Sequence, residues 1–359
     1  MSTRQPPFSR QGHAVALLAG GIGGLLFYLL GMPLAWMLGS MVFVTVAALS
    51  GQQPQVHFAA RGVMIGVLGV FLGSAFNPEV ADRIAECSLA LLVLACYVAA
   101  GSALVFVYLR RVGGFDRVTA YFASTPGGLG EMVLSAEAMG GDARRVSLVH
   151  TIRIITIVLV IPFWFRLVMD VDVPSLMPPT PGVIPHVEDW LILAACAGIG
   201  WPLAKLCRIP AAGLVGPMIL SAIAHLTGLT AVQPPPPLVA VAQLVIGASV
   251  GARFAGTPLR FVWQTARLAI ASTAVLLALA LLITLTLSDV VGVRPEAMAL
   301  VLAPGGLAEM SLIALALGVD TAFVSSMHIC RIAMIVILGP TLFRLFGRPV
   351  DKGSLTTPE

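Results

Sequence analysis

The sequence predicts an all-α polytopic membrane protein with two inverted repeats, each made of about five transmembrane helices plus one re-entrant Gly-rich hairpin. The first observation behind this fold class is the composition, because 58% of the 359 residues are hydrophobic and only 11% are charged. A soluble globule of this length needs more polar surface than such a chain offers. The other two observations are an internal repeat and an uneven distribution of Lys and Arg.

The internal repeat has a constant offset of 178 residues. Residues 126–167 and 304–345 align without a gap and are identical at 22 of 42 positions. Apolar composition alone yields chance matches of Leu and Ala, but not a matched set of polar residues, so the chain is a duplication. The Pro, Gly and polar residues that recur are Pro126, Gly127, Gly128, Glu131, Asp142, Ser147, His150 and Arg153, with Pro304, Gly305, Gly306, Glu309, Asp320, Ser325, His328 and Arg331.

Apolar stretches along both halves approach or reach the length of about 20 residues that a spanning helix needs. In the first half they cover residues 13–31, 34–50, 59–76, 86–109 and 146–169, and in the second half 190–206, 211–229, 238–252, 265–287 and 323–346. A sixth stretch in each half, at 117–139 and 297–317, is interrupted by Gly. These two interrupted stretches decide the topology.

The distribution of Lys and Arg distinguishes two topologies. If all six stretches of each half cross the membrane, the halves run parallel and 11 basic residues fall inside against 8 outside. If the interrupted stretch instead dips in and returns on the same side, 16 fall inside and 3 outside, while Arg153 and Arg331 lie within spans. Cytoplasmic loops carry the excess of basic residues. We therefore expect five crossings plus one re-entrant hairpin per half, and an odd number of crossings inverts the second half.

This topology divides the chain into five parts: a cytoplasmic N-terminal tail, a first membrane repeat, an extracytoplasmic Pro-rich linker, a second membrane repeat and a cytoplasmic C-terminal tail. Their boundaries are 1–12, 13–169, 170–189, 190–346 and 347–359. The first apolar run has no small-residue cleavage site, so we expect it to be retained. The five Cys have no CxxC spacing, which argues against a disulfide framework or a zinc site. We expect neither metal nor cofactor.

The Pro-Gly-Gly sequences at 126–128 and 304–306 predict breaks in helical geometry at membrane depth. Pro lacks a backbone donor, and Gly adopts turns that other residues avoid. Non-helical backbone inside a bilayer is tolerated only where protein buries it or a water-filled cavity solvates it. We therefore expect each break beside a cavity. The alternative, close helix packing, suits the GxxxG pairs Gly20/Gly24, Gly69/Gly73 and Gly247/Gly251 better.

Two Arg follow the breaks at matching positions within spans. Arg153 and Arg331 each lie one helical turn after a His, so each shares a helix face with it. In the inverted topology each Arg lies roughly 10 Å below its own surface, and the two bracket a central zone about 10 Å deep. Charges at such depth are costly and usually mark ion or substrate paths.

Structural roles for these charges are alternatives to a functional one. Ion pairs between Glu131 and Arg153 and between Glu309 and Arg331 would neutralise the charges and pin each hairpin to its helix. The recurring His residues are either satisfied helix histidines or a proton relay. Asp142 and Asp320 stand where they would cap the following helix.

The duplicated Pro-Gly-Gly-Leu-x-Glu-Met unit, with its downstream Asp, Val-Ser, His and Arg, resembles the AbrB family of bacterial membrane proteins. The resemblance spans essentially the whole chain. It implies a repeated membrane domain, and members are often labelled ammonia monooxygenase or regulator of gene expression. Together with the charge distribution, it implies a multi-pass protein of the bacterial cytoplasmic (inner) membrane with both termini in the cytoplasm.

A shorter similarity concerns Gly-Gly-Leu-Gly at residues 127–130. This sequence resembles the GGxG re-entrant loop of the 2-hydroxycarboxylate and sodium/glutamate symporters, which implies a site at the two Gly pairs. The second copy departs from the pattern, with Ala308 at the last position and Leu302-Ala303 in place of Ser124-Thr125. Any hydroxyl groups at the site would then come from the first half.

These features predict a secondary active transporter that moves a small organic anion, coupled to protons or sodium, by alternating access. The two Arg and the N-termini of the hairpin helices would supply positive potential. Besides the bilayer and the solute, we expect no nucleic-acid partner, and a homodimer through the first three helices of each half fits the sequence. The expected binding residues are Ser124, Thr125, Gly127, Gly128, Glu131, Arg153, Gly305, Gly306, Glu309 and Arg331, with His150 and His328 as candidates for a proton relay.

Two other functions compete with transport. A membrane regulator of gene expression would act indirectly, because no loop exceeds about 20 residues and the C-terminal tail is short. An ammonia monooxygenase needs clustered His and carboxylate ligands for copper. The six His residues are scattered along the sequence, so we do not expect an enzyme.

Overall fold

The computed structural model describes residues 9–32, 34–76, 88–168 and 185–346, which form helices and no strand. The helices of the first half are α1 (Arg10–Leu29), α2 (Ala35–Leu49), α3 (Phe58–Gly73), α5 (Ser88–Arg111), α6 (Arg117–Ser124), α7 (Leu129–Ala138) and α8 (Ala143–Val168). Those of the second half are α9 (Val187–Leu206), α10 (Ala212–Leu226), α11 (Pro236–Gly251), a 3-10 turn η1 (Ala252–Phe254), α12 (Leu259–Val291), α13 (Pro295–Leu302), α14 (Leu307–Ala316) and α15 (Thr321–Phe346).

The duplication extends from sequence to structure. Four helices of the second half, α11, α13, α14 and α15, begin 178 residues after their counterparts α3, α6, α7 and α8. The first helix of each half begins three residues earlier than predicted, at Arg10 and Val187. Most of the predicted N-terminal tail, most of the Pro-rich linker and the C-terminal tail lie outside the described residues.

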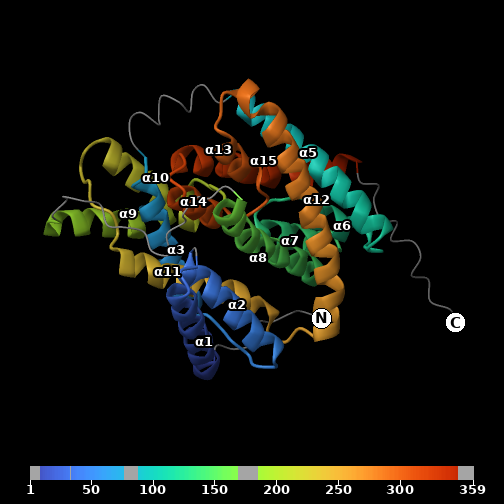
Figure 1. Cartoon of the computed structure of the whole chain (residues 1–359), viewed down its shortest axis with the longest axis horizontal. Coiled ribbons are helices and arrows are strands. Elements are labelled where there is room, and N and C mark those ends of the chain that lie inside the picture. Colours follow the sequence, from blue (N-terminus) through green and yellow to red (C-terminus); the bar gives the residue numbers. More distant parts are fainter. Residues whose placement is uncertain (1–8, 33, 77–87, 169–184, 347–359) are drawn as a thin grey trace.

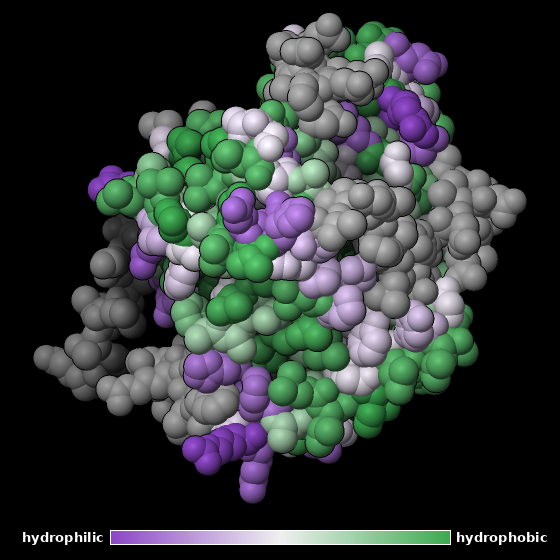
Figure 2. Space-filling view, turned by 90° about the vertical axis from the view of Figure 1, so that its left-hand side faces the viewer, coloured by the Kyte–Doolittle hydropathy of each residue, from purple (hydrophilic) through white to green (hydrophobic). Residues whose placement is uncertain are grey.

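Seven helices in the described ranges are long and apolar enough to cross a membrane. The protein is therefore a multi-pass membrane protein. Helices α2, α3 and α10 were also predicted to span, but they have only 15, 16 and 15 residues. Helices α2 and α10 begin after left-handed residues, Leu34 and Ala211, where the chain turns sharply. Figure 2 shows that hydrophobic residues cover much of the side on which α9 lies. Leu191, Ile199 and Leu206 of α9 are exposed.

The helices form two groups that each mix both repeats. Helices α1, α2, α3, α9, α10 and α11 pack together on one side of the molecule, and α5 to α8 pack with α12 to α15 on the other (Figure 1). In the first group α2 packs on α11 and α3 packs on α10, so equivalent helices exchange partners. A two-fold relation between the repeats produces this reciprocal pairing.

Gly residues bring these helix backbones together. A Cβ added at Gly69 on α3 would lie 2.5 Å from the carbonyl oxygen of Leu214 on α10. At the repeat-related contact, a Cβ added at Gly247 on α11 would collide with the carbonyl oxygen of Met37 on α2. The prediction that GxxxG pairs mediate close packing is confirmed at these helices.

Each broken stretch forms a pair of short helices. In the first repeat α6 ends at Ser124 and α7 begins at Leu129. The backbone N–H of Asp142, just before α8, donates to Thr119 Oγ1 in the first turn of α6 at 2.7 Å. The residues that follow α7 therefore lie beside the first turn of α6. The predicted caps are confirmed, because Asp142 Oδ1 accepts from the N–H of Arg145 and Asp320 Oδ1 from that of Phe323.

Candidate functional site

The helix break of the first repeat is held by a buried Arg. Residues 125–128 separate α6 from α7. The carbonyl groups at the end of α6 and the N–H groups at the start of α7 therefore lack partners within their helices. Arg153, which reaches over from α8, donates from Nη2 to the carbonyl oxygen of Ala123 at 2.6 Å and from Nη1 to that of Thr125 at 3.3 Å. The guanidinium thus bonds two carbonyl groups at the break, of which that of Thr125 also accepts from the N–H of Gly127 at 2.9 Å.

The second repeat has the same arrangement. Arg331 on α15 donates to the carbonyl oxygens of Ala303 and Gly305, both at 2.6 Å. Both Arg side chains are about as buried as any in the protein, each only 1% exposed. Neither of the considered Glu–Arg ion pairs forms among the described residues. Carbonyl groups take their place, because the broken backbone brings them closer to the guanidinium than the Glu side chains come.

The two Glu side chains turn toward the start of their own helices instead. The carboxylate of Glu131 lies over Gly128, and that of Glu309 lies over Gly306, where an added Cβ would collide with it. A carboxylate in the first helical turn is favourable because it faces free N–H groups and the positive end of the helix dipole. This geometry explains why the second Gly of each Pro-Gly-Gly precedes Glu by three residues.

A cavity of about 810 Å³ lies against both breaks. The prediction of a cavity beside the breaks is therefore confirmed. The lining includes most of the predicted binding residues from both repeats, namely Gly127, Gly128, Glu131, Arg153, Gly305, Gly306, Glu309 and Arg331, together with His150. Residues far apart in sequence thus meet at one place.

Four further basic residues from the other helix group line the same cavity: Arg61 on α3, Lys205 on α9, Arg208 after α9 and Arg253 in η1. Arg61 donates from Nε to Ser249 Oγ at 3.2 Å. Glu309 interacts electrostatically with both Arg61 and Arg253. With Arg153 and Arg331, the lining has six cationic side chains and two carboxylates, so the cavity favours anions.

Sequence reasoning counted these four basic residues only as markers of the cytoplasmic side. They lie outside the segment of strong sequence repetition, and their own segments carry no motif. Tyr97 on α5 was also missed because it is not repeated: the equivalent position in the second half is Val275. Tyr97 is fully buried, donates to the carbonyl oxygen of Leu276 at 3.3 Å, and interacts electrostatically with both Arg153 and Arg331.

Three predicted residues do not line this cavity. Ser124 and Thr125 line a separate cavity of about 550 Å³, and their hydroxyl groups donate to the carbonyl oxygens of Tyr121 and Phe122. His328 is buried away from the lining, with Nδ1 3.1 Å from the carbonyl oxygen of Val324. His150 does line the large cavity, and its Nε2 lies 2.9 Å from the carbonyl oxygen of Phe122.

The family model described as "Transition state regulatory protein AbrB" matches residues 36–347. The chain is also 26% identical to "Uncharacterized protein YhjN" of Bacillus subtilis strain 168, over 92% of this chain and 93% of that protein. It is 22% identical to "Putative regulator AbrB" of Escherichia coli strain K12, over 90% of this chain and 93% of that protein. Because the family model covers most of the chain, including both helix breaks, the protein belongs to the AbrB family.

Proposed function

We propose that the protein is a secondary active transporter that moves a small organic anion, coupled to protons or sodium, by alternating access. The observation that carries the proposal is the cavity between the two helix breaks, with its six cationic side chains. The N-termini of α7 and α14 begin at this cavity and add positive potential. Broken helices that meet at one site from two repeats are typical of secondary transporters.

The proposal includes an inverted arrangement of the repeats in the bacterial inner membrane, with both termini in the cytoplasm. The hydrogen bond between Arg61 near the start of α3 and Ser249 near the end of α11 supports it. This contact favours opposite directions for α3 and α11, which are equivalent helices. The return of α6 and α7 to one end supports the re-entrant hairpin.

Regulation of gene expression is a second proposal, carried only by the printed names of the family model and of the Escherichia coli relative. We propose that any such role is indirect and follows from the transported solute. We likewise propose a carrier and not an ammonia monooxygenase, because the cavity lining is dominated by cations, which would repel the metal ion that such an enzyme requires.

Uptake by the purified protein in liposomes tests the transport proposal. Carboxylates, amino acids and ammonium are offered in turn, with and without proton and sodium gradients. We expect uptake of at least one carboxylate that depends on one gradient. Transport of none of these solutes, or of ammonium alone, would contradict the proposal.

The site within the cavity is tested by a matched pair of substitutions. Arg253→Gln removes a cation from the lining, whereas Arg260→Gln removes one from the exposed start of α12. We expect Arg253→Gln to raise the KM for the anion at least tenfold and Arg260→Gln to leave it unchanged. Replacing both Arg153 and Arg331 by Lys should abolish uptake. Wild-type uptake by the double variant would show that the anion binds elsewhere.

A further inference from the structure

The smaller cavity, of about 550 Å³, has a chemistry unlike that of the large one. It lies between α5, α6 and α15, and most of its lining is apolar. Three of its four hydroxyl groups donate to backbone carbonyls, since Ser124, Thr125 and Tyr121 bond to Tyr121, Phe122 and Gly339 respectively. The wall therefore offers hydrocarbon to an occupant, and a small polar solute would find few partners there.

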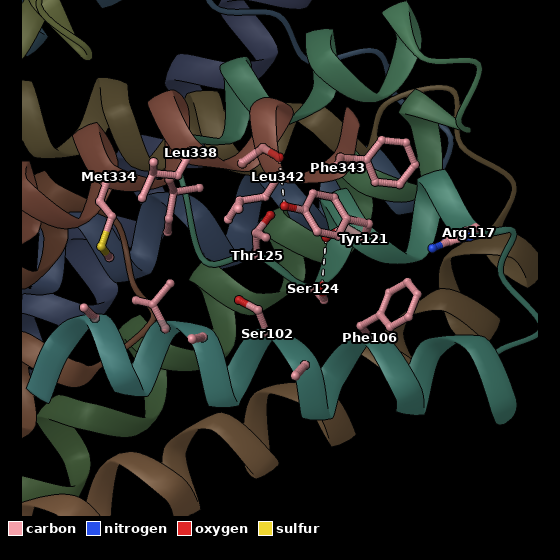
Figure 3. A pocket seen from close by; sticks show the side chains of 16 residues that line it. Ser102, Phe106, Arg117, Tyr121, Ser124, Thr125, Met334, Leu338, Leu342 and Phe343 are labelled. Carbon is pink, nitrogen blue, oxygen red and sulfur yellow. Dashed lines mark hydrogen bonds between the residues drawn. The ribbon is translucent and has the colours of Figure 1, made fainter. Parts of the chain in front are cut away.

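The cavity is elongated and has one cationic end (Figure 3). Arg117, at the start of α6, lies at one end, and Met334 and Leu338 lie toward the other. Along α5 the lining runs from Ala95 to Phe106, which corresponds to about 16 Å of helix. One leaflet of a bilayer core is about 15 Å thick. The groove therefore matches the depth of a single acyl chain.

The groove opens toward the lipid-facing surface. Ala99 and Ala103 on α5 and Leu338 and Leu342 on α15 line it and are exposed. The repeat-related counterpart of the pair α5 and α15 is the pair α12 and α8, and there α12 packs directly along α8. The gap between α5 and α15 thus lacks the protein packing that closes its counterpart, and an occupant from the membrane can fill it.

The cationic end lies close to other basic residues. Arg110 and Arg111 stand in the last turn of α5, and Arg110 donates to the carbonyl oxygen of Phe115, two residues before Arg117. Basic pockets between membrane helices on the cytoplasmic side bind the headgroups of anionic lipids. The positive-inside distribution puts these three Arg on that side.

We propose that this groove binds one anionic phospholipid from the bilayer, with an acyl chain between α5 and α15 and the phosphate at Arg117. The lipid packs against the outer face of the first hairpin, since Thr125 lines the groove and the next residue, Pro126, lines the large cavity. The binding is independent of which solute the large cavity takes.

Native mass spectrometry of the full chain in detergent tests the proposal with dioleoyl-phosphatidylglycerol, dioleoyl-phosphatidylethanolamine and oleate. We expect the wild-type protein to retain one phosphatidylglycerol in preference to the other two. Arg117→Gln should weaken phosphatidylglycerol binding at least fivefold and leave phosphatidylethanolamine binding unchanged. Ala99→Phe fills the groove and should abolish retention of both phospholipids. Ser102→Leu is a smaller change in the same wall and should weaken the retention of both.

A matched control exists on the same helix. Ala100→Phe alters an exposed residue of α5 outside the lining and should retain phosphatidylglycerol as the wild-type protein does. An unchanged melting temperature identifies the variants that are folded. The proposal is overturned if oleate is retained in preference, if folded Ala99→Phe and Ser102→Leu variants both retain phosphatidylglycerol normally, or if Ala100→Phe loses it equally.

Discussion

At the scale of single residues, the two buried Arg replace the helical hydrogen bonds that the Pro-Gly-Gly sequences remove. Each guanidinium donates to two carbonyl groups at a break. It thereby connects the break to the long helix that carries the Arg, α8 or α15. A buried carbonyl group without a partner is costly. The Arg residues therefore stabilise the break, and their unbonded Nε atoms remain buried in the described structure.

Arg331→Met should destabilise the protein by about 2–4 kcal/mol, because it leaves the carbonyl groups of Ala303 and Gly305 without a charged donor. Arg153→Met should cost less, since one of its bonds is longer, at 3.3 Å. Unfolding in detergent, followed by circular dichroism, measures both. Arg294→Met removes an exposed Arg that pairs with Glu296 and should change little. Equal stability of Arg331→Met and the wild-type protein would contradict this role.

The residue scale also marks a limit of sequence reasoning. The repeat identified Arg153, Arg331 and both Glu residues, because identity at a fixed offset separates them from the apolar background. It could not identify their partners. The side chains of Glu131 and Glu309 point toward Gly128 and Gly306, and that direction depends on the backbone path through the break.

At the scale of elements, helix pairs approach most closely where Gly faces backbone. On α9, a Cβ added at Gly200 would lie 2.5 Å from the backbone nitrogen of Pro217 on α10, whereas Gly198 has no neighbour within 4 Å. Helix limits were predictable to within a few residues for most spans, because apolar runs and Pro-Gly-Gly breaks are local signals. The short lengths of α2 and α10 were not predictable. The left-handed residues that precede these helices are Leu34 and Ala211, whereas Gly is the residue that would have indicated such a turn.

Gly200→Ala should destabilise the protein by about 1–3 kcal/mol, because backbone atoms of α10 cannot move aside as a flexible side chain can. Gly198→Ala on the same helix should be neutral or stabilise by about 0.5–1 kcal/mol, since Ala is the better helix former. Melting temperatures of the two variants in detergent provide the comparison. If both variants melt alike, α9 and α10 do not pack as described.

At the scale of the whole molecule, reciprocal pairing of α2 with α11 and of α3 with α10 joins the repeats. This pairing was not predictable from the sequence, because the Gly residues that mediate it are common in membrane helices whatever their partner. The count of Lys and Arg predicted an inverted relation, and the contact between Arg61 and Ser249 supports it.

The inverted topology predicts that equivalent positions of the two repeats face opposite sides of the membrane. Arg144 is exposed at the start of α8, and Asp320, two residues before the position equivalent to Arg144, is partly exposed just before α15. In a variant without the native Cys residues, Arg144→Cys and Asp320→Cys should react with a membrane-impermeant thiol reagent from opposite sides. Arg260→Cys should react from the same side as Arg144→Cys. Labelling of all three from one side would support parallel repeats instead.

The four basic residues that line the cavity outside the duplicated motif make the charges contributed by the two repeats unequal. A transporter with symmetric repeats would load its solute equally well from either side. Because the charge distribution predicts that Arg61, Lys205, Arg208 and Arg253 lie toward the cytoplasm, we expect them to concentrate anions on that side. The ion and solute gradients alone set the final distribution of a solute across the membrane. The rate at which the protein binds the solute can still differ between the two sides. For the transport proposed above, we expect a lower KM on the cytoplasmic side, with a difference that shrinks as salt is raised.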